Sequence, residues 1–174
     1  MAKNVLLWAV LMLLTADAAS AALILVTVEG VHLCCPSCVK AAHKAASSVE
    51  GVSVGVHAKK RTIHLTSSHP KAVQQSLAAL AAAGFHGKSS QAGIVFKNDG
   101  GAKPGKVRRA EFIGIHNCCG GCTRAIKQAV GSVEGVVADT VKPNSRSFVV
   151  EGDFEPAAVI QALNAAGFHA RIKP

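Results

Sequence analysis

All six cysteines of this 174-residue chain lie in two copies of one short pattern, His-x-Cys-Cys-x-x-Cys. The first copy spans residues 32–38 and the second spans residues 116–122; we call them the first motif and the second motif. A cluster of thiols beside an imidazole is a donor set for a soft metal ion, and it also suits a dithiol–disulfide redox couple. The sequence therefore points to metal binding or thiol redox chemistry, carried by a small unit that occurs twice.

The repeat extends well beyond the two motifs. Val-Glu-Gly-Val at residues 49–52 recurs at residues 133–136, and Gly-Phe-His at residues 84–86 recurs at residues 167–169. Between these matches the second copy first gains one residue and then loses two. Because turns tolerate insertions and deletions better than helices or strands do, we expect these length differences to lie in turns.

Hydrophobic periodicity divides each copy into six elements. The expected strands are residues 24–33, 52–56 and 61–65 in the first copy and 109–116, 135–141 and 146–150 in the second, with a short last strand after each Gly-Phe-His. The expected helices are residues 36–48 and 70–83, with counterparts that contain Ile126 and that begin near Pro156. The order β-α-β-β-α-β predicts an α+β class made of two tandem ferredoxin-like domains, each a four-stranded antiparallel sheet with two helices on one face.

The first residues of the chain have the pattern of a targeting segment. Lys3 precedes an uninterrupted apolar run over residues 5–14, and small residues suited to cleavage follow. A run of this length is too short to span a bilayer as a stable helix. We therefore predict a signal peptide at residues 1–21, a periplasmic or secreted location, and no membrane span after cleavage.

Composition also predicts how the rest of the chain is divided. Residues 22–90 and 109–174 hold one copy each, and residues 91–108 are polar and rich in Gly and Pro, which is typical of a flexible linker.

The net charge of +9 raises the question of a nucleic-acid partner. Aromatic residues make up only 4% of the chain, there is no Arg-rich stripe, and export argues against such a partner. We expect no nucleic-acid binding. The basic side chains of the first copy could instead dock an acidic face of a protein partner; they are Lys40, Lys44, Lys59, Lys60 and Arg61.

A strand, a Cys-x-x-Cys loop, a helix, Val-Glu-Gly-Val and then Ala-Gly-Phe before the last strand resemble the heavy-metal-associated domain, here in two tandem copies. That family includes copper chaperones, the periplasmic mercury-binding protein and modules of metal-transporting ATPases. The resemblance implies that the metal is held by two pairs, Cys35 with Cys38 and Cys119 with Cys122. It further implies that Phe85 and Phe168 cover the site, and that the partner is a metal transporter or an acceptor metalloprotein.

The chain departs from the family pattern at the motifs. Where the family has a buried Met, this chain has Leu33, an adequate substitute, and Asn117, a poor one. Each motif also offers a third thiol and an imidazole, and three thiolates with one imidazole suit tetrahedral Zn(II). Neighbouring side chains on an extended loop diverge, however, which argues against two adjacent cysteines binding the same ion. The additional candidate ligands are Cys34, Cys118, His32 and His116.

Other histidines carry less weight. His86 and His169 also repeat, but an imidazole at the start of the last strand more often packs or faces water. The remaining four are expected on the surface.

The favoured function is that of an exported, non-enzymatic protein that sequesters or carries a soft metal ion, Cu(I) or Zn(II). Two alternatives stay open at this point. One is a thiol-disulfide oxidoreductase, since a thiol at a helix N-terminus is chemically competent for it. The other is an interaction module in which disulfides serve only as staples.

Overall fold

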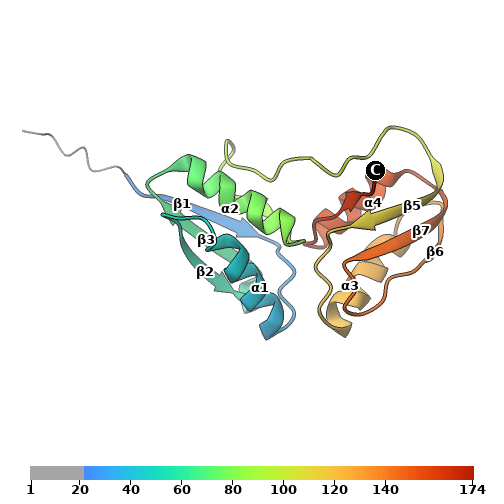
Figure 1. Cartoon of the computed structure of the whole chain (residues 1–174), viewed down its shortest axis with the longest axis horizontal. Coiled ribbons are helices and arrows are strands. Elements are labelled where there is room, and N and C mark those ends of the chain that lie inside the picture. Colours follow the sequence, from blue (N-terminus) through green and yellow to red (C-terminus); the bar gives the residue numbers. More distant parts are fainter. Residues whose placement is uncertain (1–21) are drawn as a thin grey trace, which may run out of the picture.

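The computed structural model describes residues 22–174, and the predicted signal peptide lies outside the described residues. The first half, residues 22–90, contains β1 (Ile24–Glu29), α1 (Pro36–Ala46), β2 (Ser53–His57), the 3₁₀ turn η1 (Ala58–Lys60), β3 (Thr62–Ser67), α2 (Pro70–Ala82) and β4 (Lys88–Ser89). The second half, residues 107–174, contains β5 (Val107–Ile113), α3 (Gly120–Gly131), β6 (Val136–Asp139), β7 (Ser147–Phe154), α4 (Pro156–Ala165) and β8 (Arg171–Ile172). Figure 1 shows the two halves side by side, each a sheet with its own pair of helices.

Each half has a four-stranded antiparallel sheet, in the order β2-β3-β1-β4 in the first and β6-β7-β5-β8 in the second. The predicted order of elements and the antiparallel sheets are confirmed. Alternate residues of the central strands are buried, such as Val26 opposite Leu65, so only one face of each sheet is covered. Both helices of each half pack over that face, where Ala42 and Leu77 are fully buried.

The strands predicted to run through residues 33 and 116 end earlier. β1 stops at Glu29 and β5 at Ile113, because the next residues, Gly30 and Gly114, adopt left-handed backbone conformations with φ of 77° and 85°. The chain therefore leaves the sheet after β1 and after β5, before each motif begins. The turn points both motifs away from their own sheets and toward each other.

The predicted position of the length differences was partly wrong. The helix α2 has 13 residues and α4 has 10, and β3 has 6 residues against 8 in β7. Three residues are close to one helical turn, so a helix shortened by this amount keeps the same face on the sheet. The second copy therefore differs in length inside its elements, and not only in its turns.

The segment between the halves lies along both of them (Figure 1). The Gln74 side chain accepts a hydrogen bond from the Val95 backbone and donates one back to it. Farther along, the Gly100 carbonyl accepts from the Ile172 amide at 2.8 Å. The flexibility of this linker and the domain boundaries remain predictions.

Backbone hydrogen bonds join the halves in a nearly reciprocal pattern. The His86 amide donates to the Gly167 carbonyl at 3.1 Å, and the His169 amide donates to the Gly84 carbonyl at 3.0 Å. Phe85 pairs with Phe168 in an isolated bridge between them. The two matched Gly-Phe-His segments thus form the contact that brings the motifs face to face.

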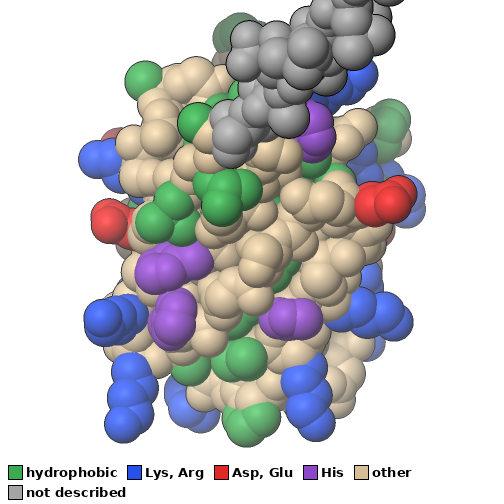
Figure 2. Space-filling model, turned by 90° about the vertical axis from the view of Figure 1, so that its left-hand side faces the viewer, with side chains coloured by type: hydrophobic (Ala, Val, Ile, Leu, Met, Phe, Trp, Pro, Cys, Tyr) green, Lys and Arg blue, Asp and Glu red, His purple; other side chains and the backbone are tan. Residues whose placement is uncertain are grey.

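No helix within residues 22–174 is long and apolar enough to cross a membrane. On the outer face of the first half, Lys and Arg side chains lie around the rim and do not gather into one stripe (Figure 2).

Candidate metal centre

Two helix N-termini position the cysteines. Cys35 is the N-cap residue of α1 and Cys119 that of α3, and both have extended backbones with no side-chain cap. Cys38 and Cys122 lie in the first turn of these helices and are fully buried. The Sγ atoms are 3.4 Å apart in the first pair and 3.7 Å apart in the second. The partial positive charge of each helix N-terminus faces its pair and favours thiolates.

The additional cysteine of each motif, Cys34 in the first and Cys118 in the second, contacts the cysteines of the opposite motif. The Sγ of Cys34 lies 3.4 Å from that of Cys119 and 3.6 Å from that of Cys122. The Sγ of Cys118 lies 3.5 Å from that of Cys38. The expectation that adjacent thiols diverge was wrong for the first motif, because the Sγ atoms of Cys34, Cys35 and Cys119 all lie within 4.8 Å of one another. Cys34 also stays 3.7 Å from Cys38 of its own motif, so it contacts both halves at once.

The six thiols therefore form one cluster rather than two pairs. The buried Sγ atoms of Cys38 and Cys122, 3.6 Å apart, stand at its centre. All six are free thiols.

The donor geometry fits a soft metal ion. Zn–S bonds of about 2.3 Å in a tetrahedron place sulfurs about 3.8 Å apart. The Sγ–Sγ contacts here range from 3.4 Å to 4.0 Å. Six soft donors at such spacing would hold metal with only small shifts of the side chains.

The two motif histidines complete the donor set. Their rings stack on the phenylalanines of the opposite half, His32 on Phe168 at 4.4 Å and His116 on Phe85 at 4.3 Å between centroids. The Nε2 atom of each histidine is buried and has no hydrogen-bond partner. Buried polar atoms are rarely left unpaired, so these two nitrogens favour a ligand at the cluster.

Phe85 and Phe168 are predicted to cover the site. Both are fully buried, and each packs against the histidine of the other half. Their contact is therefore with the imidazoles, which they hold beside the thiols.

Asn117, predicted to be a poor substitute for a buried apolar residue, is buried with its amide paired. Its Nδ2 donates to the Lys142 carbonyl at 2.8 Å, and its Oδ1 accepts from the Thr123 hydroxyl at 2.9 Å. Leu33, its counterpart, is also buried. The second motif thus rests on hydrogen bonds where the first rests on apolar contact.

The thiols differ in acidity because they bond to one another. A hydrogen bond from the Cys38 thiol lowers the pKa of Cys122 to about 2, and the same bond raises the pKa of Cys38. Burial raises the pKa of Cys34 and of Cys118 to about 12. The backbone N–H of Cys38 lowers the pKa of Cys35 to about 7. At neutral pH the metal-free cluster holds a thiolate at Cys122, and metal must displace protons from its neighbours.

Two matched arginines were not recognised as structural from the sequence. The Arg61 guanidinium donates to the carbonyls of Gly30 at 2.8 Å and of Ala166, in the other half, at 3.4 Å. Arg146 likewise donates to Ala82 across the contact, at 3.0 Å. Their repetition in the sequence was the available signal. Arg61, one of the side chains expected to dock a partner, also joins the halves.

Another residue missed from the sequence is Gly121. A Cβ at this position would lie 3.1 Å from the Sγ of Cys34, closer than side chains usually pack. The equivalent residue of the first motif is Ser37. The glycine leaves the room into which Cys34 reaches.

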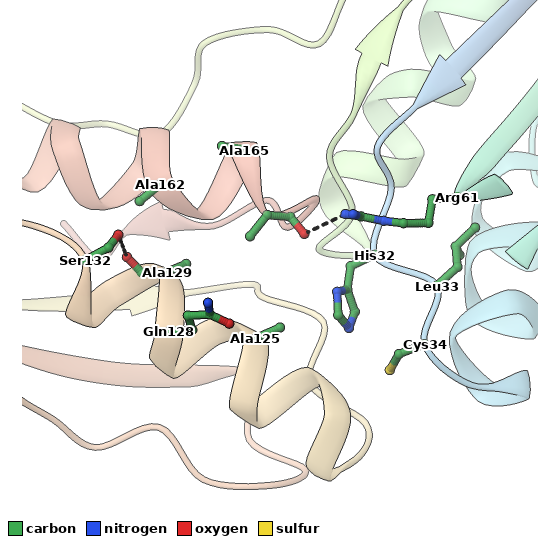
Figure 3. A pocket seen from close by; sticks show the side chains of 11 residues that line it. His32, Leu33, Cys34, Arg61, Ala125, Gln128, Ala129, Ser132, Ala162 and Ala165 are labelled. Atoms are coloured by element: carbon green, nitrogen blue, oxygen red, sulfur yellow. Dashed lines mark hydrogen bonds between the residues drawn. The ribbon is translucent and has the colours of Figure 1, made fainter. Parts of the chain in front are cut away.

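A cleft of about 550 Å³ leads from solvent to the cluster (Figure 3). His32 and Cys34 line it on one side, and small side chains of α3 and α4 line it on the other. Arg61 bridges its upper edge through the bond to Ala166. Cys34 is the one exposed thiol among the six, so the cleft gives incoming molecules access to it.

Residues 113–169 match the family model of the heavy-metal-associated domain. The matched stretch lies wholly in the second half. No curated protein matches the chain.

Three solved structures are similar to parts of the chain. A copper binding domain from HMA7, a P-type ATPase, is 22% identical, with 39% of this chain and 96% of that one covered and a TM-score of 0.34. The N-terminal soluble domains of Bacillus subtilis CopA are 16% identical, with 87% and 95% covered and a TM-score of 0.35. The water soluble region of the same P-type ATPase is also 16% identical, with 87% and 92% covered and a TM-score of 0.33. The family match and the cysteine cluster support metal binding.

Proposed function

We propose that this chain is an exported, non-enzymatic protein of two tandem heavy-metal-associated domains that binds a soft metal ion and carries or sequesters it. The match of residues 113–169 to that family is the premise for the second half. The same order of elements and the same cysteine pattern extend the proposal to the first half. Export, to the periplasm or beyond the cell, rests on the signal-peptide pattern of residues 1–21.

The cluster of six free thiols is the observation that carries the proposal. Cys38 and Cys122 are fully buried, yet neither thiol packs only against apolar side chains; each contacts other sulfurs. A soft ion such as Cu(I), or Zn(II), satisfies these donors and the unpaired imidazole nitrogens at once.

The exposed thiol of Cys34 permits transfer of the ion by ligand exchange. An acceptor thiolate can attack the ion from the cleft and replace one sulfur before the others let go, so the ion is never free in water. We propose a metal transporter or an acceptor metalloprotein as the partner. The exposed lysines of the first half, such as Lys40 and Lys59, provide charge for docking an acidic face.

One observation favours the redox alternative. The pKa of Cys35 is lowered to about 7, so this half-buried thiol is partly ionised at neutral pH, as a reactive thiol requires. A carrier and an oxidoreductase therefore make different predictions for the same reduced protein.

The test uses residues 22–174, reduced and free of oxygen. We expect native mass spectrometry to record uptake of Cu(I), and fewer bound ions when both Cys38 and Cys122 become serine. Circular dichroism of the metal-free variant checks that it is folded. Absence of uptake by the reduced protein, together with catalysed disulfide exchange in a model substrate, would replace the carrier by the oxidoreductase.

A further inference from the structure

The eight donors of the two motifs fall into three sets, and within each set all ligand atoms lie within 4.8 Å of one another. Set A is Cys38, His116, Cys118 and Cys122; set B is His32, Cys34 and Cys122; set C is Cys34, Cys35 and Cys119. Together they use every cysteine and both motif histidines. Every set takes donors from both halves of the chain, so neither half contains a complete set.

Two of the thiols belong to two sets each. Cys122 is common to sets A and B, and Cys34 is common to sets B and C. A thiolate sulfur has several lone pairs and can bind two soft ions at once. A chain of three ions, linked through these two sulfurs, would use all eight donors without leaving one idle.

We propose that the two motifs form a single site for three Cu(I) ions, in which Cys122 and Cys34 bridge adjacent ions. The inference rests on the proposed function, because it specifies how the chain holds its metal. It differs from that expectation in one respect: the pairs Cys35–Cys38 and Cys119–Cys122 are not two separate sites.

The donor numbers favour Cu(I) over Zn(II). Sets B and C offer three donors each, which suits an ion that accepts low coordination, whereas structural Zn(II) takes four. Only set A, with three thiols and an imidazole, matches the Zn(II) preference. Each Cu(I) binds by displacing thiol protons to solvent, and neither copper nor sulfur changes oxidation state.

The surroundings of the cluster suit its charge. Six thiolates with three monovalent ions leave a net charge of −3. The helices α1 and α3 both begin at the cluster, and their N-termini place partial positive charge there. Arg61 lines the cleft beside Cys34, and the overall charge of the chain is +9.

The contact between the halves holds the sets together independently of metal. Gly84 and Gly167 pack so closely on the opposite half that a Cβ at either would collide with its backbone. Hydrogen bonds from Arg61 to Ala166 and from Arg146 to Ala82 also join the two halves at this contact. The site is thus preorganised, and Cys34, a bridge that also faces the cleft, is where ions enter and leave.

A matched pair of neighbouring cysteines tests the inference. Under the shared site, Cys34→Ser removes a bridge and breaks sets B and C, so Cu(I) uptake falls from three ions to one. Cys35→Ser breaks set C alone and leaves two ions. Two separate Cys-x-x-Cys sites give a different pattern: two ions in the unchanged chain, two in Cys34→Ser and one in Cys35→Ser.

Native mass spectrometry of the reduced chain counts the ions, and X-ray absorption spectroscopy reads whether they are neighbours. We expect copper–copper scattering in the unchanged chain and in Cys35→Ser, where Cys122 still bridges, and none in Cys34→Ser. Circular dichroism of the metal-free variants checks that both are folded.

The outcomes separate the two proposals. Two ions without copper–copper scattering, unaffected by Cys34→Ser, overturn the shared site and leave the metal carrier intact. Uptake of Zn(II) at set A with no Cu(I) beyond one ion also overturns it. No uptake of either metal removes the carrier and the shared site together.

Discussion

The two motifs have the same pattern and the same place in the fold, yet they differ in how they are held and in how acidic their thiols are. The second motif is tied down by Asn117, which bonds to Lys142 and Thr123, whereas Leu33 supports the first by apolar contact alone. The exposed thiol is in the first motif, at Cys34. The second motif is thus held in place by hydrogen bonds, and the first motif carries the thiol that solvent can reach.

Acidity differs in the same direction. Cys38 and Cys122 occupy equivalent positions, but the shared hydrogen bond raises the pKa of Cys38 and lowers that of Cys122. The hydrogen bond from Cys38 thus favours the thiolate form of Cys122, in the second motif. We infer that the second motif provides the anchor for metal, while the first provides the route of exchange.

The largest expected effect comes from removing the anchor. We predict that Cys122→Ser lowers Cu(I) affinity more than about 100-fold, since even residues outside the coordination sphere cost 10–100-fold when lost. Cys38→Ser, at the matched position, should cost less because Cys38 belongs to one set and Cys122 to two. Competition titrations with a Cu(I) chelator measure both. Equal losses would mean that the two motifs are equivalent.

The next effect concerns the contact between the halves. Gly167 has φ of +90°, and a Cβ there would collide with the backbone of Gly30 and His32; Gly114 has φ of +85° and nothing near it. Alanine at either position therefore strains the backbone by about 1–2 kcal/mol, but only Gly167→Ala should force the halves apart. We expect a larger radius of gyration by small-angle scattering and weaker Cu(I) binding for this variant alone. If Gly114→Ala weakened Cu(I) binding as much, backbone strain rather than the contact would be responsible.

Acid should also loosen this contact. Burial lowers the pKa of His86 to about 4 and lowers those of His116 and His169 below their usual value, despite the carboxylate of Asp99 at 3.1 Å from His169. The unfolded chain, with histidine pKa near 6.5, then binds more protons than the folded one between about pH 6.5 and pH 4. Stability contributed by the neutral rings is full above pH 6.5 and is lost as the pH falls through that window.

Urea unfolding of the reduced, metal-free chain at several pH values measures this loss. We expect His86→Gln to flatten the fall in midpoint between pH 6.5 and 4. His43→Gln, which changes an exposed imidazole, should leave it unchanged. A fall of the same size in all three proteins would place the acid sensitivity outside these rings.

Periodicity and turn chemistry predicted the elements, because each helix and strand is set by local spacing and by flanking Pro and Gly. The ends of the first strands were mispredicted because of the contact between the halves, whereas the length differences inside α2 and α4 are local. Gly30 ends β1 before His32, and Arg61, placed on a docking surface from its charge, also bonds to Ala166 of the other half. The sequence predicted the candidate ligands residue by residue. It could not reveal that Cys34 faces Cys119, because that depends on how two units pack.

The smallest expected effect on Cu(I) binding concerns the two glycines that begin α3, Gly120 and Gly121. The first motif has Pro36 and Ser37 at the matching positions. A Cβ on Gly121 would lie 3.1 Å from the Cys34 Sγ, while one on Gly120 would meet only the end of the Arg124 side chain at 3.7 Å. Both alanines favour the helix, so both should raise the thermal midpoint slightly. Only Gly121→Ala displaces Cys34 from its rotamer, at a cost of about 0.5–1.5 kcal/mol, and should weaken Cu(I) binding roughly three- to tenfold. The same chelator competition detects this difference. Equal affinities in the two variants would show that Cys34 does not need its place beside Gly121, and the first motif would then not depend on the second for its accessible thiol.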